Sequence, residues 1–293
     1  MCCLASYANK NAVEIPFAEN LWGNAKRLQF VDGSIACRFG GNRQAIRVLD
    51  IGCGNGTALA IPLAKIGYRI FGVDPHAKSI SRAVALAPAN AKFHCGQLSD
   101  IPPERFHAII ISEVLEHLDD PDSLLSASLS YLAEDGLLVI TVPNGYGEFE
   151  IDSRLFRNLR LDFAYDVARD LLWKARRRER PAAAIGSTDN PCGHLQRFTL
   201  SRLMRMFAGN GLRVVQSCAS CFISGPLVCI TLGRLESFIR LNVKLADWLP
   251  LRACSGWFFA LERAELKEEK YRYSDLPPGT TPDRSNTARA ISA

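Results

Sequence analysis

The sequence lacks the features that mark membrane-spanning, secreted, fibrous or disordered proteins. Of its 293 residues, 48% are hydrophobic and 22% are charged, which is close to the average for globular chains. No uninterrupted apolar run is long enough to span a bilayer, and the first residues do not show the basic and apolar regions of a secretion signal. No internal repeat is visible. We therefore expect one large domain with insertions, or two small domains.

The sequence also lacks a strong excess of charge of one sign. Its 35 Lys and Arg residues exceed its 30 Asp and Glu residues by five, which is too few to require a nucleic-acid partner. The ten cysteines are scattered, and the one Cys-x-x-Cys pair, Cys218 and Cys221, has no second pair to complete a tetrahedral metal site. We expect reduced thiols, a cytoplasmic location and no bound metal.

From residue 46 onward, short apolar runs alternate with helical patterns. This alternation predicts a doubly wound, Rossmann-like α/β fold, with a seven-stranded sheet that is mostly parallel, a final antiparallel strand and helices on both faces. The predicted strands are residues 46–51, 69–74, 91–95, 108–112, 137–142, 212–223 and 256–261, and the predicted helices are residues 57–66, 77–86, 123–132 and 200–210.

A glycine-rich turn follows the first predicted strand. Gly52, Gly54 and Gly56 occupy alternate positions, where they let the backbone bend sharply and a ligand approach closely. Asp50 closes the strand and can take the ammonium group of a ligand, and Asp74 ends the second strand, where it can accept both hydroxyls of a ribose. A dinucleotide site would instead favour Gly-x-Gly-x-x-Gly.

Residues 48–56 resemble the first motif of class I S-adenosylmethionine-dependent methyltransferases. Four more segments resemble later motifs of the family, in the right order: residues 72–74 (ribose acid), 96–102 (adenine side), 112–118 (after strand four) and 134–144 (fifth strand). Residues 193–199 are similar to a downstream segment of a group that includes the ubiquinone-biosynthesis O-methyltransferases. The resemblance is close over residues 46–145 and looser over residues 193–223.

This resemblance implies S-adenosyl-L-methionine as the cofactor. Gln97 stands where family members often carry an acid, and its amide can still hydrogen-bond the adenine edge. The residues that the resemblance implies for cofactor binding are Asp50, Gly52, Cys53, Gly54, Gly56, Asp74, Pro75, Gln97, Leu98, Ser112 and Glu113.

Methyl transfer from a sulfonium is an in-line displacement that needs alignment and, for a hydroxyl acceptor, removal of a proton. His117, just beyond the fourth strand, is a candidate general base or substrate-positioning residue, with helix capping as its alternative role. His194, at the end of the first insertion, is a second candidate if a lid closes over the acceptor.

The resemblance suggests the N-terminal cap region, and the pattern of the sequence suggests the other divisions of the chain. Residues 1–45 would form a cap-helix region, with the helix within residues 19–39 covering the cofactor. Residues 46–263 would form the methyltransferase domain, with insertions at about 146–195 and 224–254, and residues 264–293 a flexible tail.

The insertions bear on the acceptor, which we expect to be a small molecule, a glycan or a lipid-linked compound methylated at oxygen. Residues 155–180 predict a basic amphipathic helix, which would either pack as a lid or contact an anionic membrane at the inner face or a phosphorylated substrate. Charges interrupt residues 227–249 too often for a membrane span, so this segment can at most lie on a membrane.

Residues 142–145 lack the Asp/Asn-Pro-Pro-aromatic motif of base-flipping amino-methyltransferases, which disfavours a nucleic-acid acceptor. Two other functions remain open: a catalytically silent S-adenosylmethionine-binding protein and, disfavoured by the glycine spacing, an NAD-dependent oxidoreductase. The sequence does not determine the oligomeric state.

Overall fold

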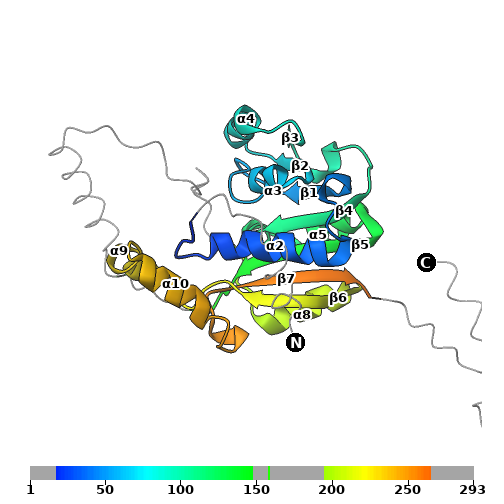
Figure 1. Cartoon of the computed structure of the whole chain (residues 1–293). Helices are drawn as coiled ribbons and strands as arrows, with labels where there is room; N and C mark the ends of the chain where they lie inside the picture. The colour runs from blue at the N-terminus through cyan, green and yellow to red at the C-terminus, as the bar shows by residue number, and fades with distance from the viewer. Residues whose placement is uncertain (1–17, 148–157, 159–194, 265–293) are drawn as a thin grey trace, which may run out of the picture. The chain divides into compact units, whose positions relative to one another are not determined.

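The computed structural model describes residues 18–147, 158 and 195–264. The chain divides into two units, Met1–Arg263 and Ala264–Ala293, and all described residues but Ala264 lie in the first. This unit is built on a seven-stranded sheet with the order β3-β2-β1-β4-β5-β7-β6 (Figure 1). The strands are β1 (Arg47–Ile51), β2 (Arg69–Asp74), β3 (Ala91–Cys95), β4 (Phe106–Ser112), β5 (Leu132–Pro143), β6 (Leu212–Ala219) and β7 (Gly256–Arg263).

The strand directions confirm the predicted fold class. Strands β1 to β5 pair in parallel, whereas β7 is antiparallel to both β5 and β6. Because two reversals cancel, β6 runs in the same direction as β5. The carboxyl ends of β1 to β6 therefore lie along one edge of the sheet, where doubly wound folds bind their ligands.

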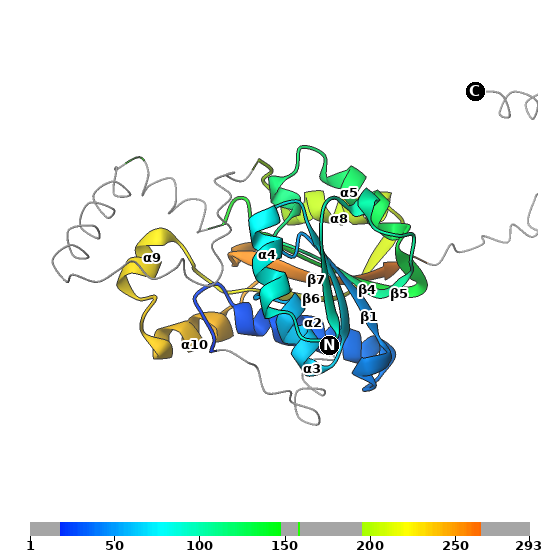
Figure 2. The same cartoon turned by 90° about the horizontal axis from the view of Figure 1, so that it is seen from above.

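Helices cover both faces of the sheet, as Figure 2 shows from above. Helices α2 and α3 share a buried cluster on one face, and α5 and α8 share a cluster on the other. On β7, the Phe258 ring lies 5.8 Å from that of Phe30 in α2, and the Phe259 ring lies 5.4 Å from that of Phe207 in α8. The helices on the sheet are α2 (Asn24–Phe39), α3 (Ala60–Ile66), α4 (Ala77–Leu86), α5 (Pro121–Leu129) and α8 (Leu200–Gly209).

Two of the predicted helices differ from the structure by more than one residue at their ends. The predicted helix 57–66 begins at Ala60, because the Asn55 side chain accepts hydrogen bonds from the backbone and hydroxyl of Thr57 and holds a turn there. The predicted helix 123–132 spans Pro121–Leu129, since Asp120 caps its N-terminus and Leu132 already pairs with Phe106 as the first residue of β5.

Helix α2 crosses the sheet from the ligand-binding edge to the opposite edge. Near its start, Gly23 packs against the backbone of Ser220, just beyond β6. Near its end, Arg38 donates to the carbonyl of Asp135. Part of α2 is held by a cluster in which Arg43 donates two hydrogen bonds to Asp32 and the Tyr68 hydroxyl donates a third.

Between β6 and β7 the chain forms a helical insertion at the same edge of the sheet (Figures 1 and 2). It contains α9 (Pro226–Thr231), α10 (Glu236–Leu245) and the short 3-10 helix η4 (Leu251–Ala253). The predicted strand 212–223 ends early because the backbone after Cys221 bonds to Asn242 of α10 instead of continuing the sheet. Among the described residues, no helix is both long and apolar enough to cross a membrane.

Candidate cofactor and acceptor site

The glycine-rich turn leaves the carboxyl end of β1 with a backbone that favours glycine. Gly52, Gly54 and Gly56 all have positive φ angles, of 72°, 55° and 73°. A Cβ on Gly52 would lie only 2.4 Å from a methyl carbon of Val114. The turn is anchored to the neighbouring strand, because the N–H groups of Gly52 and Cys53 both donate to the carbonyl of Val73.

Asp74 ties this turn to the end of β2. Its Oδ2 accepts a hydrogen bond of 2.9 Å from the N–H of Gly54, and its Oδ1 accepts one of 2.8 Å from the N–H of His76, beyond Pro75. The carboxylate is thus fixed at the point where the first two strands end together. Each oxygen retains lone-pair capacity for a ligand hydroxyl.

Asp50 lies buried next to the turn, with 3% of its surface exposed. Burial raises the pKa of its carboxyl from 3.8 to about 7, and the nearby negative charge of Asp74 adds to this rise. The same causes, burial first and then Asp50 and Asp74, raise the pKa of the Cys53 thiol, so this thiol stays protonated. The two acids lie close together at this end of the sheet, and a cationic ligand would relieve their repulsion.

The segment after β3 forms a compact turn. Because β2 lies between β1 and β3, this turn and the glycine-rich turn lie on opposite sides of the end of β2. Gln97 and Asp100 cap the short 3-10 helix η2 (Leu98–Asp100) reciprocally, and the Gln97 N–H donates to Asp100 at 2.7 Å. Leu98 is buried, and its carbonyl accepts a hydrogen bond from the Tyr131 hydroxyl. The turn thus offers an apolar wall with backbone polar groups beside it.

The carboxyl end of β4 carries a polar network that includes Ser112 and Glu113. Thr141 on β5 donates to Glu113 at 2.9 Å and lies 2.8 Å from the Ser112 hydroxyl. Arg27 of α2 reaches the same place, donating to Ser112 at 3.4 Å with its guanidinium 3.5 Å from the Glu113 carboxylate. Glu113 is the one non-glycine residue with positive φ in the described part of the chain, and such strain is concentrated at functional sites.

Glu116 and His117 follow in the 3-10 helix η3 (Leu115–His117). Glu116 is 1% exposed, and burial raises the pKa of its carboxyl well above the usual value, with the charge of Glu113 adding to the rise. The His117 Nε2 lies 3.8 Å from Glu116 Oε1, and the imidazole is partly exposed. The Glu116 carbonyl accepts hydrogen bonds from Leu195 and Gln196, which brings the end of the first insertion to this point.

The structure therefore gathers most of the sequence-predicted residues at one edge of the sheet. The turn residues and Asp50 stand at the end of β1, Asp74 and Pro75 at the end of β2, Gln97 and Leu98 after β3, and Ser112 and Glu113 at the end of β4. His194 and the basic segment 155–180 lie outside the described residues, so their positions stay predictions. No three metal-ligating side chains gather into a metal site among the residues that the structure describes.

Sequence reasoning missed Arg27, whose contacts cross from α2 to the end of β4. Its guanidinium also lies 5.6 Å from the centre of the Phe258 ring. An arginine in an amphipathic helix usually faces water, and only the packing of α2 on β7 reveals that Arg27 points into the site. No sequence pattern could have distinguished it from Arg38 in the same helix.

A sheet of this order, with a glycine turn after β1 and an acid at the end of β2, defines the fold of class I S-adenosylmethionine-dependent methyltransferases. A family model described as a methyltransferase domain matches residues 25–217. The chain belongs to this family of methyltransferases.

Curated relatives and solved structures agree with this assignment. The chain is 29% identical over 131 residues to a ubiquinone biosynthesis O-methyltransferase of Rhodopseudomonas palustris and 32% identical to one of Bradyrhizobium diazoefficiens; each match covers 41% of this chain. The matched segment spans about half the length of these relatives (51%).

Two solved structures show the same fold, each with a TM-score of 0.51. One is a methyltransferase in complex with the Haloferax volcanii Trm112 methyltransferase activator, at 16% identity, with 84% of this chain and 90% of that chain covered. The other is PKMT2 from Rickettsia typhi in complex with AdoHcy, at 14% identity, with 78% and 52% covered.

Proposed function

We propose that this protein transfers the methyl group of S-adenosyl-L-methionine to a hydroxyl oxygen of a small or lipid-linked acceptor. The observation that carries this proposal is that a glycine turn, a buried acid and a strand-terminal acid lie together at the ends of β1 and β2. In the reaction, an oxygen–methyl bond forms as the sulfur–methyl bond breaks. S-adenosylmethionine would supply the methyl group and leave as the neutral thioether S-adenosylhomocysteine, and a base of the protein would take the hydroxyl proton.

The cofactor residues have distinct roles in this proposal. Asp50 in its ionised form would bind the ammonium group of the methionine part, and Asp74 would accept hydrogen bonds from the ribose hydroxyls. The turn formed by residues 52–56, including Cys53, would let the backbone approach the cofactor closely. Pro75, Gln97 and Leu98 would border the adenine, and Ser112 and Glu113 would close the site from β4.

Two histidines are the candidates for handling the acceptor proton. His117 stands next to the β4 end and is partly exposed, so it can exchange a proton with water. His194 precedes Leu195, whose backbone is bound to Glu116. The similarity to ubiquinone biosynthesis O-methyltransferases supports oxygen as the methylated atom and a quinone precursor as a first acceptor to test.

The first experiment is calorimetric titration of the full chain with S-adenosylmethionine and, separately, with NAD. We expect binding of the first only, weakened about 100-fold in Asp74→Ala, because two hydrogen bonds to a charged group are lost. Asp135→Ala removes an exposed acid at the other edge of the sheet and serves as the matched control. Binding of NAD alone would refute the proposed cofactor.

A second experiment addresses catalysis with phenolic and lipid-linked hydroxyl acceptors. Replacing His117 by Ala is expected to lower kcat at least about 100-fold, the lower end of the contribution of a general base, with cofactor affinity unchanged. Turnover within a few-fold of the parent would exclude His117 as the base and shift the test to His194→Ala. Cofactor binding without turnover on any acceptor would instead indicate a catalytically silent binding protein.

A further inference from the structure

Helix α10 carries apolar side chains on two opposite faces. Ile239, Val243 and Ala246 are buried against the rest of the unit. Leu241 and Leu245 lie one helical turn apart on α10 and are 55% and 37% exposed, and Trp248, in the turn just beyond the helix, is 87% exposed. A surface helix normally has polar residues opposite its buried face. The outward apolar stripe of Leu241, Leu245 and Trp248 therefore indicates a binding surface.

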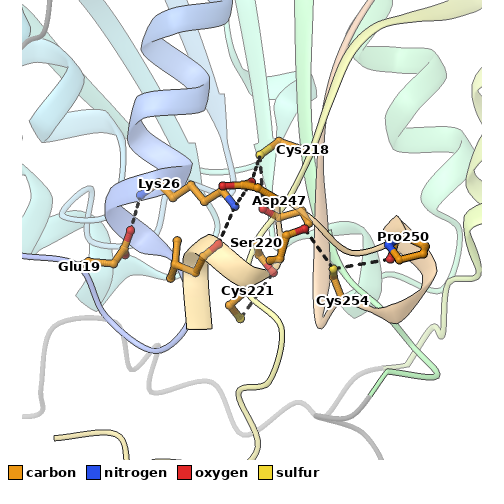
Figure 3. A network of polar contacts seen from close by, with 11 residues as sticks. Glu19, Lys26, Cys218, Ser220, Cys221, Asp247, Pro250 and Cys254 are labelled. Atoms are coloured by element: carbon orange, nitrogen blue, oxygen red, sulfur yellow. Dashed lines mark hydrogen bonds and ion pairs between the residues drawn. The ribbon is translucent and has the colours of Figure 1, made fainter. Parts of the chain in front are cut away.

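The orientation of this stripe is fixed by strong contacts on the buried side. The buried Asn242 side chain accepts a hydrogen bond from the Ile223 N–H at 2.9 Å and donates one to the Ile223 carbonyl at 2.7 Å. Figure 3 shows Lys26 reaching from α2 to Asp247, where the ion pair measures 2.6 Å. Lys26 also donates to the carbonyl of Val243. The outward face cannot turn inward without breaking these bonds.

The charges around the stripe are predominantly basic. The exposed cations are Arg234, Arg240, Lys244 and Arg252, against two acids in the same stretch. Both acids are in ion pairs, Glu236 with Arg240 and Asp247 with Lys26, so the charges of Arg234, Lys244 and Arg252 remain in excess. The surface therefore presents net positive charge beside exposed Leu and Trp side chains.

We propose that this face of α10 docks on an anionic phospholipid bilayer. Exposed leucines would enter the acyl boundary, the tryptophan would sit at the headgroup level, and the lysine and arginines would pair with lipid phosphates. Charge complementarity favours this occupant over a second copy of the chain, because two such faces would bring like charges together.

Docking in this way would place the bilayer at the reactive edge of the sheet. α10 follows β6, whose carboxyl end lies on the same edge as the glycine turn and Asp74 (Figures 1 and 2). A lipid-linked acceptor could then pass from the bilayer to the site without crossing water. Delivery of an acceptor rests on the proposed function, whereas docking of α10 does not.

Vesicle flotation of the full chain tests the docking. We expect the protein to float with vesicles of phosphatidylcholine and phosphatidylglycerol, less with phosphatidylcholine alone, and less at high salt. The double variant Leu241→Gln/Trp248→Ala is expected to lower the partition coefficient at least about tenfold, because two apolar side chains no longer enter the bilayer. Leu86→Gln changes a leucine of α4 that is 57% exposed and should bind as the parent does.

Thermal unfolding and S-adenosylmethionine affinity of the double variant are expected to match the parent, since both side chains are more than half exposed and neither is among the proposed cofactor-binding residues. Full binding by the double variant would assign membrane contact to another segment and overturn the proposal. Equal binding to neutral vesicles would overturn its electrostatic part. A dimer that dissociates in the double variant would show that a second copy covers the face instead.

Discussion

The raised pKa of Asp50 makes cofactor binding dependent on pH in a predictable way. The cofactor-free protein holds a proton on Asp50 below a pKa of about 7, because its carboxyl is buried beside Asp74. The ammonium of S-adenosylmethionine requires the ionised carboxylate, so binding must first remove that proton. Below pH 7 the affinity should fall with a slope that approaches tenfold per pH unit, which is about 1.4 kcal/mol.

The expected size of the effect follows from the fraction of ionised Asp50. That fraction is about half at pH 7 and about one hundredth at pH 5, so affinity should fall about fiftyfold between them. Titration calorimetry in two buffers of different ionisation enthalpy measures the proton directly. About one proton should be released per cofactor near pH 5. The titrations should be made at or below pH 7, because the amino group of the cofactor has a pKa of about 8 and its loss of charge would also weaken binding.

Two variants complete this test. Asp50→Asn should bind weakly at every pH and release no proton, and Asp135→Asn, at the opposite edge of the sheet, should behave as the parent does. The cofactor-free parent should lose stability as pH rises from about 4 to about 7, because its folded state binds the proton more tightly than its unfolded state. Equal heats in both buffers near pH 5 would refute the assignment of Asp50 to the ammonium group.

Three further predictions concern stability. Gly52→Ala should lower the free energy of unfolding by about 2–4 kcal/mol in urea titration, because φ is 72° and the new Cβ would meet a valine methyl at 2.4 Å; unchanged stability would contradict the turn geometry. Arg43→Met should lower the free energy of unfolding by about 3 kcal/mol, because Asp32 loses its ion pair. Tyr68→Phe should lower it by about 1 kcal/mol, because Asp32 loses one hydrogen bond; equal losses in the two variants would disprove this ranking. Burial raises the pKa of Glu116, so its proton stabilises the parent at low pH and this contribution is lost as pH rises above about 4.5. Between pH 5 and pH 8, Glu116→Gln should lose less stability in urea titration than the parent does, and the loss due to Asp50 should remain; an equal loss in both proteins would contradict this.

The sequence was sufficient to predict the strands that surround the cofactor site. Buried parallel strands read as apolar runs, and the predicted strands 69–74 and 91–95 match β2 and β3 in full. Errors arose where side chains and long-range pairing set the limits of an element. The cap by Asp120 moved the start of α5, and the pairing of Leu132 with Phe106 extended β5 toward its amino end.

The candidate site was predictable only where local spacing determines it. Alternate glycines and strand-terminal acids are signals within a few residues, so Asp50 and Asp74 could be placed at one edge of the sheet. The approach of Arg27 to Glu113 and the outward face of α10 depend on how distant elements pack. The charges of residues 227–249 excluded a membrane span, but only the buried side of α10 shows which leucines remain outside.

Helix α2 forms several of its contacts with parts of the chain that are synthesised much later. Ser34 bonds to Gln216 across 182 residues, and Lys26 bonds to Asp247 across 221. At ordinary rates of translation, α2 leaves the ribosome roughly 10–40 s before β6, α10 and β7 exist to receive it. Until then, the apolar side chains of α2 that later pack on these elements are exposed and can bind chaperones. A nascent chain that stops before β7 should leave the part of α2 that packs on β7 uncovered and should be degraded, even though its cofactor motifs are complete.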